Sequence, residues 1–144
     1  MKFLVIFLLI LAAFGFFYFA DKKAHETTKI QVNGIEVGVK IADTAKKRSQ
    51  GLMHVENLGE NQGMFFIFPT SNFHTFWMKN TLISLDLIWI NKNNEIVHIK
   101  ENAQPCKTLN CEVYSTPKPA KYVLEVNGGW VEKNGVGVGN LVVR

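Results

Sequence analysis

The chain has 144 residues, of which 47% are hydrophobic, 19% charged and 12% aromatic, and its formal net charge is +4. This composition excludes a largely disordered chain and is typical of one globular domain that can bury a core without metal ions. Basic residues are interspersed with acidic ones and the longest basic run is Lys46-Lys47-Arg48, so the charge pattern gives no indication of a nucleic-acid partner.

The first segment, residues 3–20, is uncharged and almost entirely apolar. As a helix it would be about 27 Å long, close to the thickness of the hydrocarbon core of a bilayer. We therefore expect a signal anchor or a cleaved signal peptide over residues 1–20, in preference to a buried globular helix. A polar linker over 21–28 and a β-rich domain over 29–144 would follow. The domain would then face the periplasm or exterior, held at the cell membrane, or secreted if the segment is cleaved.

The next segments predict a β-hairpin and a short helix. Residues 29–33 and 35–42 alternate apolar and polar side chains around Asn33-Gly34, a dipeptide that favours a tight hairpin turn. Asp43-Thr44 is a typical helix N-cap, which predicts a helix through residue 50. Gly51 is its expected C-terminal stop.

The rest of the chain contains apolar or alternating segments bounded by turn residues. They predict strands over 63–69, 74–80, 83–90, 95–101, 122–126 and 141–143, and a helical turn over 129–134. The connections are too short for βαβ crossovers. The chain is thus expected to be all-β, a mainly antiparallel sandwich or distorted barrel with one or two short helices.

Cys106 and Cys111 are separated by four residues. Outside the cytoplasm such a pair most simply forms a structural disulfide, which would pin the Pro-flanked segment 104–116. A redox-active pair is the sharper alternative, but it usually has a C-x-x-C spacing on a helix N-terminus. Free thiols and metal binding are further alternatives.

No cofactor or metal site is expected. The four histidines are scattered and lack the spacing of metal ligands: His25, His54, His74 and His98. The chain also lacks the G-x-S-x-G motif, which places a serine nucleophile on a strand-to-helix turn.

Several blocks in a fixed order resemble the family catalogued as domain of unknown function 192 (DUF 192). They include Gly51-Leu52-Met53, residues 63–69 and Phe76-Trp77-Met78-Lys79-Asn80-Thr81. The resemblance extends from about residue 30 to residue 142. It implies a bacterial or archaeal, often exported, all-β domain of sandwich type, and it brings no established activity. One departure is Ser84, where many members of the family have proline.

The strongest candidate site combines Trp77, Lys79, Asn80, Thr81 and Asp86. Asp86 lies inside an apolar run, where a buried carboxylate needs a partner, and Lys79 is the nearest cation in sequence. One interpretation is a structural ion pair, with Asn80 and Thr81 capping a turn. The other is a polar site for a sugar-like or amide-bearing ligand, with Trp77 as a stacking face.

These observations favour a binding or accessory module for an envelope-associated small ligand or protein partner, and not an enzyme. One alternative is a hydrolase acting on envelope glycan or peptide, in which Glu101 or Glu125 would pair with Asp86. Another is a scaffold subunit of a membrane complex, with the N-terminal helix as its membrane contact.

Overall fold

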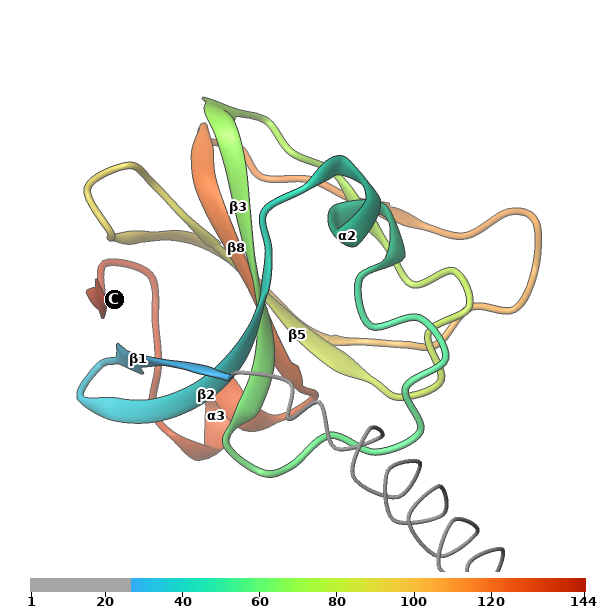
Figure 1. Cartoon of the computed structure of the whole chain (residues 1–144), viewed down its shortest axis with the longest axis horizontal. Coiled ribbons are helices and arrows are strands. Elements are labelled where there is room, and N and C mark those ends of the chain that lie inside the picture. The colour runs from blue at the N-terminus through green and yellow to red at the C-terminus, as the bar shows by residue number, and fades with distance from the viewer. Residues whose placement is uncertain (1–26) are drawn as a thin grey trace, which may run out of the picture.

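The computed structural model describes residues 27–144 and is mostly β, with one curled sheet, a two-stranded ribbon and two short helices (Figure 1). The curled sheet has the order β6-β5-β8-β3-β2-β1-β9, and β4 pairs with β7 in the ribbon. The strands are β1 (Thr28–Val32), β2 (Ile35–Ala42), β3 (Gln62–Asn72), β4 (Phe76–Trp77), β5 (Leu85–Ile90), β6 (Ile96–Ala103), β7 (Val113–Tyr114), β8 (Ala120–Asn127) and β9 (Val142–Val143). The helices are α2 (Ala45–Gln50) and α3 (Trp130–Lys133).

The N-terminal anchor or signal segment expected over residues 1–20 lies outside the described residues. Within residues 27–144, no helix has both the length and the apolar character that a membrane crossing requires.

The predicted hairpin and helix at the start of the domain are confirmed. Asn33 and Gly34 have φ values of 50° and 82°, the left-handed geometry of a tight turn between β1 and β2. The Thr44 side chain accepts a hydrogen bond from the Lys47 N–H at 3.2 Å and caps α2. Gly51, at φ 51°, ends the helix where another residue would be strained.

The connection between β2 and β3 is a crossover between parallel strands. The prediction that the chain has no such connection is therefore wrong. β2 and β3 are parallel neighbours, with Lys40 opposite Met64 and Ala42 opposite Phe66. Residues 43–61 join them, and α2 with the loop that follows it supplies the length that a parallel connection needs.

The strand predicted over residues 74–80 is reduced to the two residues of β4. It pairs with β7, which the sequence pattern did not predict, and not with β5. The chain turns after Met78, whose carbonyl accepts the Thr81 N–H at 3.1 Å. Asn80 has a left-handed φ of 56°, which ends the extended conformation.

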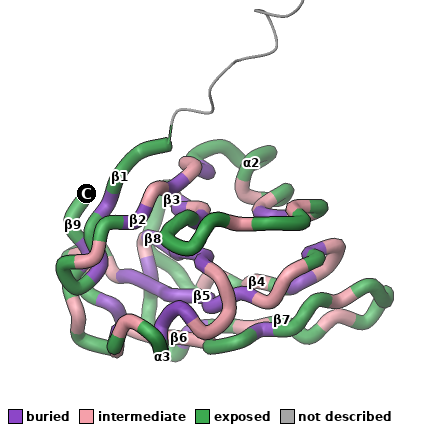
Figure 2. The backbone as a smooth tube through the Cα atoms, turned by 90° about the horizontal axis from the view of Figure 1, so that it is seen from below, coloured by how far each residue is buried: buried purple, intermediate pink, exposed green. Residues whose placement is uncertain are grey.

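The central strands β3, β8 and β5 are buried on both faces (Figure 2). The first core lies inside the curl of the sheet, since it draws on all seven strands and on α3. Its members are Ile30, Val32, Val37, Val39, Phe65, Ile88, Ile90, Ile96, Tyr122, Leu124, Val126, Trp130, Val131, Val136 and Val142. The second core lies on the opposite face and comprises Ala42, Leu52, Phe66, Met78, Leu85, Leu87, Trp89, Ala103, Ala120 and Val123.

The two edges of the curled sheet meet near the C-terminus. The Ile96 N–H donates to the Asn140 carbonyl at 2.9 Å, and the Val142 N–H donates to the Asn94 carbonyl at 2.8 Å. An isolated antiparallel bridge joins Glu95 and Leu141 beside them. These bonds satisfy backbone groups that an open sheet would leave unpaired at its edges.

Gly63 in β3 provides a test of how tightly the central strands pack. A Cβ at this position would collide with the main-chain oxygen of Glu125 on β8, whereas a Cβ at Gly38 would have only the Asn61 oxygen nearby, at 3.9 Å. We expect Gly63→Ala to lower the free energy of unfolding by about 3 kcal/mol through overpacking. The matched Gly38→Ala variant should change it by less than about 1 kcal/mol. Equilibrium unfolding in urea measures both, and equal effects would contradict the packing.

Candidate functional site

A cavity of about 270 Å³ opens on the second-core face of the sheet. In Figure 1, α2 and the loop after it lie on one side of the β3–β8 pair, and they form part of this cavity's wall. The cavity, called here the Glu125 pocket, is lined by residues 48–53 and 75–77, by Phe66, Phe68 and Thr81, and by Glu125.

Glu125 is the only carboxyl group among the residues that line this pocket. It lies on β8 between Leu87 of β5 and Met64 of β3 in the strand register, and it is 5% exposed. Its Oε2 atom is buried and has no hydrogen-bond partner within residues 27–144. Burial raises the pKa of the Glu125 carboxyl to about 8, because the charged form is poorly solvated there.

The one cationic side chain that lines the pocket, Arg48, is held by other groups. Its Nη1 donates to the main-chain oxygens of Asp43 and Ile67, at 2.7 and 2.8 Å. The guanidinium carbon lies 5.3 Å from the centre of the Phe68 ring. None of the salt bridges within residues 27–144 includes Glu125. The carboxyl therefore has no cation that would favour its ionised form.

Aromatic rings form part of the pocket wall. Phe66 and Phe76 meet edge to face with ring centres 5.0 Å apart, and Phe76 packs in the same way on buried Trp89, at 5.9 Å. Trp77 is 48% exposed, so its ring is accessible from solvent. A pocket that combines aromatic and apolar walls with a few polar side chains and one unpaired buried carboxyl oxygen has the general character of a small-molecule site.

Four of the five residues singled out from the sequence lie at or beside this pocket. Trp77 and buried Thr81 line it, and the Lys79 ammonium lies 5.2 Å above the Trp77 ring. Asn80 occupies the turn between Lys79 and Thr81, where its N–H donates to the Cys106 carbonyl at 3.0 Å. Asn80 and Thr81 are the two residues expected to cap a turn, and the structure places Asn80 in that turn with a φ of 56°.

Asp86 is in a different place, and the predicted ion pair with Lys79 does not form within the described chain. Its carboxylate is fully buried and accepts three backbone N–H groups. Oδ1 accepts from Asn102 at 2.7 Å and Gly129 at 3.1 Å, and Oδ2 accepts from Val131 at 2.8 Å. Asp86 thus ties β6 and the start of α3 to β5, and backbone donors replace the expected cation.

The carboxylate pairs suggested for a hydrolase are not formed by these residues. Asp86 is opposite Val126, a residue of the first core, whereas Glu125 is opposite Leu87, a residue of the second core. Because neighbours in register share a face, Asp86 and Glu125 point to opposite sides of one sheet. Glu101 is exposed on β6, while Asp86 is closed off by its backbone donors.

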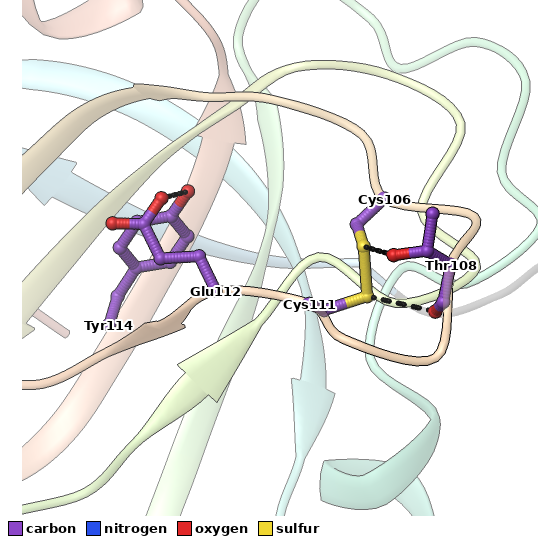
Figure 3. Close-up of a disulfide and its surroundings, with 5 residues drawn as sticks. All are labelled: Cys106, Thr108, Cys111, Glu112 and Tyr114. Atoms are coloured by element: carbon purple, nitrogen blue, oxygen red, sulfur yellow. Dashed lines mark hydrogen bonds between the residues drawn. A yellow bond between two sulfur atoms is a disulfide. The ribbon is translucent and has the colours of Figure 1, made fainter.

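The predicted disulfide between Cys106 and Cys111 is present (Figure 3). Figure 3 shows Thr108 inside the small loop that the bond closes, with its main-chain oxygen 3.4 Å from the Cys111 sulfur. The Cys106 N–H donates to the Met78 carbonyl at 3.1 Å, so the loop is fastened to the segment that follows β4.

No group of three His, Cys, Asp or Glu side chains within residues 27–144 is placed to hold a metal ion.

Sequence reasoning named Glu125 only as a partner for Asp86 and did not identify Arg48, Gly51 or Phe66 as pocket residues. The signal for Glu125 was a single charge inside an apolar alternating strand, the same signal that drew attention to Asp86. Gly51 lies close to this carboxyl group, since a Cβ there would be 3.8 Å from Glu125 Oε2. Only the crossover between β2 and β3 brings this glycine to β8.

Replacing Asp86 tests its structural role. Asp86→Asn keeps the shape but turns an NH₂ group toward backbone N–H donors, which leaves buried groups unsatisfied. We expect the free energy of unfolding to fall by about 2–3 kcal/mol. The exposed control Asp43→Asn breaks only the surface ion pair with Lys47 and should change it by less than about 1 kcal/mol. Chemical denaturation at pH 7 distinguishes them, and an unaffected Asp86→Asn protein would overturn the assignment.

The stability of the protein should depend on pH through Glu125. Between pH 4.5, its ordinary pKa, and about pH 8, its folded pKa, the unfolded state releases the proton while the folded state keeps it. The unfolded state then binds fewer protons, so the free energy of unfolding falls as the pH rises through this window and levels off above it. Glu125→Gln should remove this contribution and be more stable than the wild type at pH 8, by on the order of a few kcal/mol.

Denaturation curves at several pH values measure this effect. The exposed residue Glu56 provides the control, because Glu56→Gln should leave the pH dependence of the wild type in place. A Glu125→Gln protein with the same pH profile as the wild type would show that the Glu125 carboxyl ionises freely in the folded state.

Comparison with known proteins places the chain in a family. Residues 28–143 match the DUF192 family, described as Uncharacterized ACR, COG1430. UPF0127 proteins of Thermococcus kodakarensis and Thermococcus sibiricus are 30% and 35% identical over 109 and 100 residues, which cover 72% and 65% of this chain. Those matches span 62% and 57% of the two relatives, so the chain spans less than two thirds of their length.

Two crystal structures have a similar fold. A Sinorhizobium meliloti protein, described as a proposed transcription regulator, has a TM-score of 0.75 and 31% identity over 81% of this chain and 94% of its own. A Novosphingobium aromaticivorans protein of unknown function has a TM-score of 0.78 and 28% identity over 86% of this chain and 89% of its own. The family match covers nearly all of the described residues, and the chain belongs to the DUF192 family.

Proposed function

We propose that the protein is a binding module that holds a small ligand in the Glu125 pocket. The observation that carries this proposal is the unpartnered Oε2 atom of Glu125, which is buried at the pocket wall. A buried polar atom without a partner destabilises a fold, and such atoms are rare in native proteins. A ligand that completes the hydrogen bonding of Glu125 would compensate for this destabilisation.

The rest of the pocket supports the same proposal. Its volume of about 270 Å³ is close to the lower end of known small-molecule sites and suits a molecule of metabolite size. Trp77 offers a half-exposed ring in the pocket lining, and buried Thr81 offers a hydroxyl group. A ligand could therefore combine a flat or apolar face with polar groups.

We further propose that the module works outside the cytoplasm. The disulfide between Cys106 and Cys111 supports this location, because such bonds persist mainly in oxidising compartments. The apolar segment over residues 3–20 would be its anchor or its export signal.

Docking of a protein partner is the second candidate. Trp77 and Val113 are opposite each other on the β4–β7 ribbon and are 48% and 57% exposed, and Leu109 in the disulfide loop is 90% exposed. Apolar side chains gathered on one exposed ribbon are a feature of interaction surfaces.

A thermal-shift screen of the full chain tests ligand binding. The panel would contain single sugars, amino acids, short peptides and nucleotides. A ligand present at about 100 times its dissociation constant adds about 2.7 kcal/mol, which should raise the unfolding midpoint by several degrees. The shift should disappear in Trp77→Ala and persist in Phe73→Ala, which removes a ring of similar exposure outside the pocket.

Two outcomes would count against the pocket. A shift that survives both Trp77→Ala and Thr81→Val would place the binding site elsewhere. The absence of any shift across the panel would favour the partner-docking candidate instead.

A further inference from the structure

The chemistry around Glu125 indicates what kind of ligand the pocket accepts. We infer that the ligand meets Glu125 through an uncharged group that both donates and accepts hydrogen bonds, such as the hydroxyl groups of a single sugar or a carboxamide, and that ammonium ligands are disfavoured. This inference rests on the proposed function and specifies its ligand class.

The first argument is the environment of the carboxyl group. Its neighbours in the sheet are Leu87 and Met64, and the ring of Phe66 and the backbone of Gly51 lie on the pocket side. None of these groups stabilises a negative charge. A glutamate in such surroundings is held in its acid form, which has one O–H donor as well as acceptor oxygens.

The second argument is the hydrogen-bonding character of Arg48. The guanidinium lines the same pocket, and its hydrogen bonds to the carbonyls of Asp43 and Ile67 fix it there. An uncharged ligand with acceptor oxygens could use the remaining guanidinium N–H groups as donors, whereas an ammonium group has no acceptor to offer them.

The third argument is the population of the ionised form. With a pKa near 8, about one tenth of the Glu125 side chains are ionised at pH 7, so a ligand that requires the carboxylate loses about tenfold in affinity. A ligand that pairs with the acid form has nearly the whole population available. The hydroxyl of Thr81, the hydroxyl of Thr75 and the amide of Gln50 extend the set of neutral hydrogen-bonding groups around it.

The matched probes are N-acetylglucosamine and glucosamine, which share a ring and differ in bearing an amide or an amine. Propionamide and propylamine form a second, smaller pair. Isothermal titration of the full chain at pH 6 should show binding by the uncharged member of at least one pair and weaker or no binding by the ammonium member. Affinity for the uncharged member should fall about tenfold between pH 6 and pH 9, because Glu125 ionises over this range.

Two variants make the test specific for Glu125. Glu125→Gln keeps a neutral donor and acceptor, so it should bind the uncharged probe within a few-fold of the wild type and with no pH dependence. Glu125→Leu removes both and should abolish binding. Circular dichroism of each variant checks that the fold is retained.

The opposite results would overturn the inference. Tighter binding of the ammonium members at pH 6, with an affinity for propylamine that rises toward pH 9 and is lost in Glu125→Gln, would show that the pocket is a cation site. Failure of all four probes would overturn the uncharged class as well. In either case the proposed function would still stand if the screen yields a ligand whose effect Trp77→Ala removes, so the two failures are distinguishable.

Discussion

The burial of the central strands on both faces is the constraint on which the rest of this structure depends. β3, β8 and β5 lie between two apolar cores, so a polar side chain on either face loses its contact with water. Asp86 and Glu125 are the two acidic side chains in this position. Asp86 has all of its hydrogen-bond partners within the domain, whereas Glu125 has an oxygen without a partner. Asp86 is therefore part of the framework of the domain, and Glu125 is part of its candidate site.

Asp86 faces the first core and is satisfied by the backbone. Its three N–H donors come from two segments far apart in sequence, Asn102 in one and Gly129 and Val131 in the other, and they converge on one carboxylate. The donors at Gly129 and Val131 belong to the start of α3, where backbone N–H groups have no partners within the helix. This arrangement is complete without a ligand, so Asp86 belongs to the framework.

Glu125 faces the second core and is left without a donor for Oε2. The covering layer on this face consists of α2, the ribbon and the loops, and it leaves a cavity over the carboxyl group. The disulfide loop is bonded through Cys106 to Met78 and Asn80, on either side of Lys79, and so supports the wall that carries Trp77 and Thr81. A fixed wall around an unsatisfied group is what a preorganised binding site requires.

The sequence by itself determined the β class, the first hairpin, the capped helix α2 and the disulfide, because each depends on local patterns. Asn33-Gly34 and Thr44 act through backbone geometry within a few residues, and the two cysteines are separated by only four residues. The importance of 76–81 was also visible, as a dense group of aromatic and polar residues.

Only the tertiary structure decided which strands are neighbours and what each buried charge contacts. The parallel pairing of β2 with β3 brings Gly51 and Arg48 to β8, and no local pattern encodes that distance. The register of β5 on β8 sends Asp86 and Glu125 to opposite faces, so the nearest cation in sequence was not the partner of Asp86. Sequence spacing identifies charges that need partners, but the partners are chosen by contacts between segments that are remote along the chain.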